Sequence, residues 1–164
     1  MSGRRCAGFA TSNRKTERKC TSFFENAAKA AGFKELDFAA PLKEGDKFYI
    51  VNRGKSIFLG VMGSRPVSEG VHIVTAHIDS PRLDFKQTPL YEDTNLALAK
   101  THYYGGIKKY QWVTIPLAIH GTVILKDGAK VKINIGDKEG DPCFVITDLL
   151  PHLAQNQMVK KANE

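Results

Sequence analysis

Apolar residues recur at helical spacing in one early part of the chain. Between residues 20 and 31 they stand at i, i+3, i+4, i+7, i+8 and i+11, which places them on one face of a helix. This stripe comprises Cys20, Phe23, Phe24, Ala27, Ala28 and Ala31. Thr16 followed by Glu17 favours a helix start, and Gly32 favours a helix end. The spacing therefore predicts a helix between these signals.

The hydrophobic pattern then changes to that of β-strands. KFYIVN (47–52) and SIFLGVM (56–62) are short runs of β-branched and aromatic residues around a polar stretch that contains Gly54, which predicts a hairpin. VHIVTAHI (71–78) is almost wholly apolar, as is typical of a strand covered on both faces. Helix, hairpin and buried strand together predict the N-terminal part of an α/β domain. A complete α/β domain needs more helices and parallel strands than the rest of the chain offers.

Strand-like runs without a clear amphipathic helix dominate from residue 84. They are LALAKTHYYGG, QWVTIPLAIHGTVIL, AKVKINIG and CFVI. Asp127-Gly128 is a tight-turn signal between two of them. DLLPHLAQNQMVKK (148–161) suggests a loop and then a helix, with Pro151 at an early position. We therefore divide the chain into residues 1–83, part of an α/β domain, and residues 84–164, an incomplete β-rich module.

Positive charge is concentrated at the N-terminus. The chain has a formal net charge of +7, but residues 1–20 hold six basic residues and one acidic residue, and the remainder is close to neutral. This distribution favours a solvated tail or a helix start over a nucleic-acid surface. An organelle presequence is a lesser alternative. No apolar run approaches the ~18 residues of a membrane span, and the N-terminus lacks the apolar core of a secretory signal.

Three cysteines, Cys6, Cys20 and Cys143, are widely spaced and odd in number, and there is no C-x-x-C motif. This usage argues against a disulfide framework and against a zinc ribbon. It favours a reducing compartment, so we expect a cytoplasmic protein without membrane or nucleic-acid partners.

The sequence VTAHIDSPRLD (74–84) holds the first candidate chemistry. In a strand, residues i and i+2 point to the same face, so His77 and Asp79 would project together at the end of the expected strand. A carboxylate beside a metal-bound imidazole commonly accepts its second N–H and fixes the tautomer. H-x-D can thus supply one metal ligand and its orienting group. The ordinary alternative is a histidine bonded to a nearby carboxylate or carbonyl.

Other polar and aromatic positions are less specific. His152 lies in LLPHLAQ, where a half-buried histidine bonded to a carbonyl is the simpler reading. YYGG (103–106) could line a pocket, although a β-turn is the simpler explanation. His72 reads as structural, and His102 and His120 have no evident partner. The chain holds no phosphate-binding glycine motif and no G-x-S-x-G nucleophile motif.

Four segments in this order and spacing resemble a known family. AHIDSPRLD (76–84), YYGGIKKYQW (103–112), PLAIHGTVI (116–124) and DLLPHLAQNQM (148–158) look like the aspartyl aminopeptidase and aminopeptidase I family of dinuclear zinc exopeptidases. The similarity runs from about residue 14 to the last residue. It implies peptide substrates and two zinc ions, with cobalt or manganese as alternatives.

The resemblance also implies roles for single residues. His77 would bind one zinc ion, and Asp79 would orient its imidazole. The β-rich module would be an insertion that mediates dimerisation, within a larger tetrahedral particle. His152 would reach from this module into the active site of the neighbouring subunit.

The chain departs from the family pattern in length. Family members are far longer, and their bridging Asp, Glu-Glu pair, second Asp and final His lie beyond the matched region; this chain contains no Glu-Glu dipeptide. A two-metal hydrolytic site needs ligands for two ions and a base for the attacking water. We therefore interpret the chain as the N-terminal portion of such an enzyme or a shortened relative, and expect negligible activity from it alone. The alternatives are a non-catalytic oligomerisation module and, less favoured, a small basic nucleic-acid-binding protein.

Overall fold

The structure is a computed structural model that describes residues 16–161. Its internal contacts divide the chain into two units, one ending at Ser80 and the other running from Pro81. The first contains a helix and a three-stranded sheet, and the second contains two two-stranded sheets. This division lies three residues before the expected boundary between residues 83 and 84. No helix within residues 16–161 is long and apolar enough to cross a membrane.

The first unit begins with helix α1, Glu17–Ala30, which starts and ends where the sequence predicts. Thr16 is the N-cap: its backbone is extended, and its hydroxyl oxygen accepts a hydrogen bond from the Lys19 N–H at 3.3 Å. The chain leaves the helix through Gly32, whose φ of +81° suits a residue without Cβ. The helix residues that become buried are Cys20, Thr21 and Ala28. The buried face is therefore narrower than the predicted apolar stripe.

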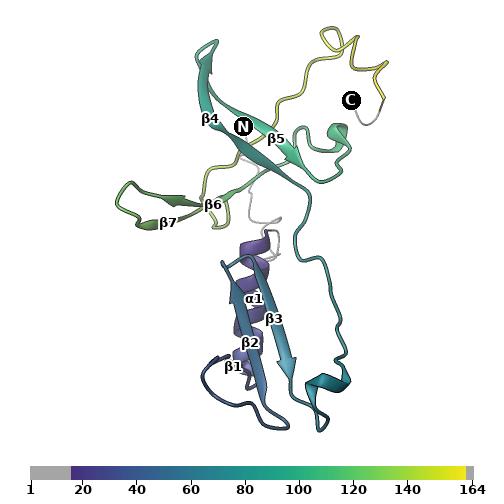
Figure 1. Cartoon of the computed structure of the whole chain (residues 1–164). Helices are drawn as coiled ribbons and strands as arrows, with labels where there is room; N and C mark the ends of the chain where they lie inside the picture. The colour runs from purple at the N-terminus through teal and green to yellow at the C-terminus, as the bar shows by residue number, and fades with distance from the viewer. Residues whose placement is uncertain (1–15, 162–164) are drawn as a thin grey trace. The chain divides into compact units, whose positions relative to one another are not determined.

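Helix α1 packs on a mixed sheet in which β1 (Lys34–Glu35) runs parallel to β2 (Lys47–Asn52), and β3 (Ser56–Val61) runs antiparallel to β2 (Figure 1). The small core of this unit centres on Tyr49 of β2, which is 3% exposed. The Lys29 ammonium lies 5.7 Å from the centre of the Tyr49 ring and so extends the contact between helix and sheet.

The predicted hairpin is β2–β3, and its turn explains why it forms. Arg53 and Gly54 both have positive φ, +53° and +66°, and the Lys55 N–H donates to the Asn52 carbonyl at 3.0 Å. Two consecutive positive φ values give a turn whose twist matches that of the strands. The apolar strands therefore meet through a connection of only three residues.

The expected buried strand at residues 71–78 does not form. After the short 3-10 helix η2 (Val67–Glu69) the chain runs without regular structure to Ser80. Apolar side chains in this stretch face solvent: Ile73 is 68% exposed and Val74 is 97% exposed. The prediction is wrong for this structure because no neighbouring strand within residues 16–161 covers or pairs with the segment.

The second unit begins with a long hairpin, β4 (Arg82–Asp93) and β5 (Leu96–Tyr104). Its two-residue turn is formed by Thr94 and Asn95, both with positive φ, and the strand register shifts between Phe85 and Leu90. The strand-like character predicted from residue 84 is confirmed here.

A second hairpin consists of β6 (Ile119–Ile124) and β7 (Lys130–Ile135), and it follows the 3-10 helix η3 (Lys109–Gln111). The predicted Asp127-Gly128 turn joins the strands. Gly128 has a φ of +85°, and the Asp127 side chain accepts the Ala129 N–H at 2.9 Å.

The rest of the second unit is less regular than expected. CFVI contributes two isolated bridges, Phe144 to Leu117 and Ile146 to Val113. Residues 148–161 form turns, so the predicted helix there is wrong. The apolar side chains of this segment are largely exposed, and a short helix needs a surface on which to bury them. Cys143 is disulfide-bonded. The wide spacing and odd number of the cysteines in the chain did not predict this bond.

Candidate functional site

His77 and Asp79 meet in the first unit, just before the Ser80-Pro81 step. The His77 Nε2 lies 2.8 Å from Oδ1 of Asp79, and its Nδ1 lies 3.1 Å from the backbone oxygen of Asp79. The His77 side chain is 76% exposed, whereas the Asp79 side chain is 11% exposed. The carboxylate is therefore held by the protein, and the imidazole is presented to solvent.

This geometry differs from the expected one in two respects, because the strand from whose end the pair was expected to project does not form and because the ring contacts differ. The two side chains were predicted to project together from a strand end, with the carboxylate on one ring nitrogen and the other nitrogen facing a metal ion. They do interact, but both ring nitrogens face oxygen atoms of the same residue, Asp79. A neutral imidazole binds a metal through a free ring nitrogen, so His77 must release one of these contacts before it can act as a ligand.

His152 lies in the second unit and is exposed. It sits inside a turn in which the Leu153 N–H donates to the Leu150 carbonyl at 2.8 Å. The neighbouring residue that becomes buried is Ala154, at 8% exposure. The histidine therefore presents its ring from a surface turn. A role in the active site of another subunit stays a prediction.

The described residues do not form a metal site by themselves. Within residues 16–161 no group of three or more His, Cys, Asp or Glu side chains is placed to hold a metal ion. The His77–Asp79 pair has the donor types of one corner of a zinc site, an imidazole and an orienting carboxylate. A zinc ion needs about four ligands, so a zinc site at this pair would need ligands in addition to His77.

His120 has partners that the sequence analysis missed. Its Nδ1 lies 3.1 Å from Oδ1 of Asn134, and its Nε2 lies 3.2 Å from Oδ1 of Asp137. His120 and Asn134 are register partners across β6 and β7. Counting back from the Asp127-Gly128 turn would have revealed this pairing. The contacts link the two strands and the turn that follows β7.

The YYGG segment ends β5 and packs against the start of β4. The Arg82 guanidinium lies 3.9 Å from the centre of the Tyr104 ring, and its Nε donates to Oδ1 of Asp84 at 2.7 Å. Gly105 has a φ of +77° and approaches Pro81 closely enough that a Cβ would lie 3.5 Å away. Tyr103 and Tyr104 belong to β5 and Gly105 forms a bend, so the segment closes the base of the hairpin without the β-turn that the sequence suggested.

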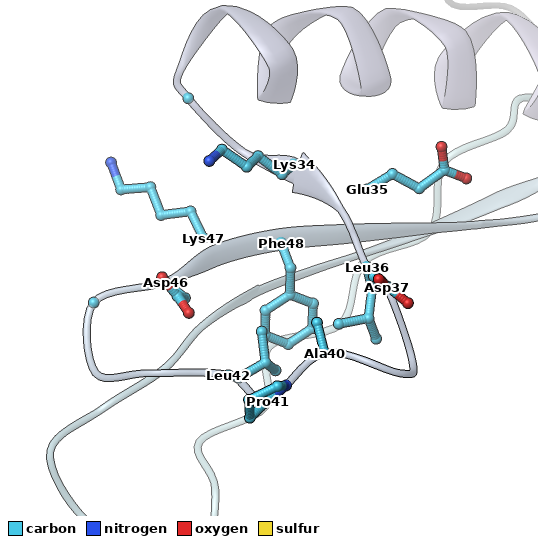
Figure 2. Close-up of a pocket in the computed structure, with 12 residues that line it drawn as sticks. Lys34, Glu35, Leu36, Asp37, Ala40, Pro41, Leu42, Asp46, Lys47 and Phe48 are labelled. Carbon is cyan, nitrogen blue, oxygen red and sulfur yellow. The ribbon is translucent and has the colours of Figure 1, made fainter.

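A cavity of about 410 Å³ lies in the first unit between β1, the loop that follows it and the start of β2. Figure 2 shows Lys34 and Lys47 extending on one side of it, with Leu42 and Phe48 beneath. The Asp46 carboxylate is turned onto the Lys43 N–H at 2.7 Å. The lining has no histidine, cysteine or serine, and its ionisable side chains are those of Lys34, Lys47, Glu35, Asp37 and Asp46.

Comparison with known proteins places the chain in a family. Residues 11–164 match the family model described as aminopeptidase I zinc metalloprotease (M18). The probable M18 family aminopeptidase 1 of Clostridium acetobutylicum is 52% identical over 157 residues, which are 93% of this chain and 34% of that protein. The chain thus spans about a third of the length of such relatives and corresponds to their N-terminal portion.

Solved structures give the same result. The crystal structure of aminopeptidase I from Clostridium acetobutylicum has a TM-score of 0.82 at 52% identity and matches 94% of this chain and 35% of that one. The M18 family aminopeptidase from Thermotoga maritima has a TM-score of 0.82 at 45% identity, with 94% and 35% covered. The mixed helix-and-sheet fold is therefore that of part of an M18 aminopeptidase.

Proposed function

Because the chain belongs to the aminopeptidase I zinc metalloprotease family (M18), we propose that it is part of a zinc aminopeptidase that removes N-terminal residues from peptides. The observation that carries this proposal within the structure is the 2.8 Å contact between His77 and Asp79. The exposed imidazole can act as a zinc ligand, and the largely buried carboxylate can act as the group that orients it.

Each residue of the pair has a distinct task in this proposal. His77 supplies one nitrogen ligand, and the Asp79 carboxylate holds the ring by the other nitrogen. Zinc in a complete site supplies Lewis-acid chemistry and an activated water. The described residues do not complete that site, and no reaction step is assigned to them beyond holding and orienting.

The second unit adds assembly to the proposal. Residues 84–164 would mediate pairing of two subunits, and His152 would serve the neighbouring active site by stabilising the developing oxyanion. The exposed turn around His152 and the exposed apolar side chains of the hairpins, such as Leu90 at 80% and Ile124 at 65%, favour contacts beyond the chain itself. The same exposure favours a second candidate function, an assembly module without catalysis. A cytoplasmic location belongs to the proposal as well.

Activity measurements separate the two candidates. Aminoacyl-nitroanilides with acidic and apolar residues are assayed with zinc, cobalt and manganese, first on the 164-residue chain and then on its fusion to the remaining two-thirds of the Clostridium relative. We expect negligible turnover from the first and metal-dependent turnover from the second. His77→Ala should lower kcat/KM of the fusion by at least ~100-fold, as loss of a ligand does.

A matched histidine variant controls for nonspecific damage. His102→Ala removes another exposed histidine, whose Nδ1 lies 3.2 Å from the backbone oxygen of the adjacent Tyr103, and should leave turnover unchanged. A fusion that folds and assembles but never hydrolyses these substrates with any of the metals would favour the assembly module. Turnover by the isolated chain that is lost in His77→Ala would show that ligands within it have been missed.

A further inference from the structure

The cavity of about 410 Å³ in the first unit has walls that backbone hydrogen bonds fix at both ends. The Leu36 N–H donates to the Tyr49 carbonyl at 2.9 Å, which ties the end of β1 to β2. The Met62 N–H donates to the Asp46 carbonyl at 2.9 Å, which holds the end of the intervening loop beside β3. Sites for small molecules commonly measure about 300–1,000 Å³. The cavity therefore has the volume of a small-molecule site and is formed without a ligand.

Phe48 and Leu42 give the cavity an apolar floor (Figure 2). The Phe48 ring lies directly over Gly60 of β3, where a Cβ would collide with the ring. Phe48 and Gly60 are register partners across β2 and β3, so the ring is held against the sheet. Leu42 is 38% exposed. The floor therefore offers an aliphatic or aromatic group a fixed apolar surface.

Two lysines of the lining have no carboxylate partner. Within residues 16–161, no ion pair joins Lys34 or Lys47 to an acidic side chain. The Lys47 ammonium lies 5.7 Å from the centre of the Phe33 ring, a contact that leaves its N–H groups available. Lys34 and Lys47 come from β1 and β2, which are neighbouring parallel strands. Both ammonium groups are therefore available to one negatively charged group of a ligand.

Two carboxylates of the lining are each bonded through one oxygen. Oδ1 of Asp37 accepts the Ala39 N–H at 2.9 Å, and Oδ2 of Asp46 accepts the Lys43 N–H at 2.7 Å. These bonds fix the position of each carboxylate on the loop. In the part of the chain that the structure describes, the second oxygen of each carboxylate accepts no hydrogen bond. Each can therefore accept one from a ligand.

Both signs of charge beside an apolar floor match a zwitterion. A simple anion would meet three carboxylates of the lining, and a simple cation would meet two ammonium groups. Figure 2 shows the ends of Lys34 and Lys47 on the same side of the Phe48 ring as Asp46, whereas Asp37 lies on the other side. An α-amino acid carries its carboxylate and ammonium groups on one carbon atom, which suits the first side. A peptide has its charged ends further apart and would need Asp37.

We propose that this cavity binds a free α-amino acid with an apolar side chain. Its carboxylate lies between Lys34 and Lys47, its ammonium group donates to Asp46, and its side chain packs on Leu42 and Phe48. The binding itself does not rest on the proposed function, because it uses neither zinc nor the candidate zinc ligand. An aminopeptidase releases molecules of this class, so in the proposed enzyme the cavity is a second binding site for the product; this point alone rests on the proposed function.

The test titrates L-leucine into the 164-residue chain in the presence of EDTA and follows the amide resonances of residues 32–48. We expect shifts that saturate in these residues. Three analogues each lack one group: 4-methylpentanoate lacks the ammonium group, L-leucinamide lacks the carboxylate, and glycine lacks the side chain. Each should bind at least ~10-fold more weakly than leucine, because each has lost one of the three contacts.

Lysine variants test the carboxylate contact. The double variant Lys34→Gln and Lys47→Gln should weaken leucine binding by at least ~10-fold, because both charged donors are lost. Lys55→Gln makes the same change at an exposed lysine in the turn between β2 and β3, outside the cavity, and should leave binding unchanged. The amide resonances of α1 show that each variant is folded.

Aspartate variants test the ammonium contact and separate an amino acid from a peptide. Asp46→Asn and Asp37→Asn each keep an oxygen that can accept the loop N–H and remove the charge. Leucine binding should weaken in Asp46→Asn and stay unchanged in Asp37→Asn. The dipeptide L-alanyl-L-leucine should bind more weakly than leucine to the unaltered chain. Tighter binding of the dipeptide, lost in Asp37→Asn, would show that the cavity takes peptide ends and would overturn the assignment to amino acids.

Other outcomes would also overturn the proposal. These are shifts that grow without saturation, analogues that bind as well as leucine, and equal weakening by Lys55→Gln and the double lysine variant. The titration is repeated on the fusion to the remaining two-thirds of the Clostridium relative, where loss of binding would show that another part of the polypeptide covers the cavity. Failure of the proposed function looks different: a fusion that binds leucine in this cavity but hydrolyses no peptide keeps the site and loses the enzyme.

Discussion

Residues 47–61 and residues 71–78 are both rich in β-branched, aliphatic and aromatic side chains, but only the first stretch pairs in this structure. In β2 and β3 each strand finds its partner across a three-residue connection whose positive φ values already favour the hairpin. Residues 71–78 have no such neighbour close in sequence. The difference shows that strand-like sequence gives a strand only where something supplies hydrogen bonds and cover.

Helix α1 follows the same rule as the hairpin. Its cap lies beside it in sequence, and the helix packs on β2 and β3 within the same unit. Interactions between residues close in sequence therefore distinguish the folded part of the first unit, α1 with β2 and β3, from the extended segment at residues 71–78. The predictions below test this contrast, from the largest expected effect to the smallest.

Substitution of Tyr49 should have the largest effect. Tyr49→Ala removes a side chain that is 3% exposed between helix and sheet, and we expect a loss of about 3 kcal/mol of stability in the first unit, within the range for large-to-small aromatic substitutions. Val74→Ala, at 97% exposure, should change it by less than about 0.5 kcal/mol. Native-state hydrogen exchange of the α1 amides measures both. Similar losses would show that residues 71–78 are packed in solution and would remove the contrast.

The features that sequence could predict share one physical property. Thr16, Gly32 and the Asp127-Gly128 turn act through neighbours within a few residues, and each lies where the pattern predicts it. The strand at 71–78 and the helix within 148–161 do not form, because apolar residues alone do not specify a partner distant in sequence or in another polypeptide. A pattern reports what a segment can bury, and the surroundings decide whether it does.

The candidate site divides in the same way. The meeting of His77 with Asp79 follows from their spacing of two residues, and it is present at 2.8 Å. The second contact, to the carbonyl of Asp79, belongs to the ordinary alternative that the sequence also offered, a histidine bonded to a nearby carboxylate or carbonyl. The His120–Asn134 contact was predictable from the hairpin register but requires the turn to be placed first.

Removal of the helix cap should have an intermediate effect. Thr16→Ala deletes the hydroxyl that accepts the Lys19 N–H, and loss of such a cap costs about 1 kcal/mol. Thr16→Ser keeps the oxygen and should retain most of the stability. Exchange of the first-turn amides of α1 reports the difference. If the first-turn amides exchange equally fast in Thr16→Ala and Thr16→Ser, the hydrogen bond from the Lys19 N–H to the side chain at position 16 does not stabilise the helix.

Acid should have the smallest effect, confined to the loop after β7 in the second unit. The carboxylate of Asp141 accepts the Lys138 N–H at 2.9 Å and the Gly136 N–H at 3.0 Å, and these bonds hold the pKa of Asp141 below its ordinary value of 3.8. A lowered pKa means that the bonds stabilise the loop fully above the ordinary value and are lost as the pH falls through the lower folded value. Between pH ~6 and ~2, a range that spans ordinary carboxyl titration, the amide resonances of Gly136 and Lys138 should therefore shift together with a midpoint below 3.8.

Asp141→Asn keeps an acceptor oxygen without a titrating charge and should abolish the transition, whereas Asp148→Asn, whose carboxylate accepts the Leu149 N–H, should leave it in place. A transition that persists in Asp141→Asn, or a midpoint above 3.8, would mean that the loop is not held by this carboxylate. In that case the hydrogen bond between Asp141 and Gly136, five residues apart, would not stabilise the loop. The contrast between segments with nearby partners and the extended segment at 71–78 would then rest on the first unit alone.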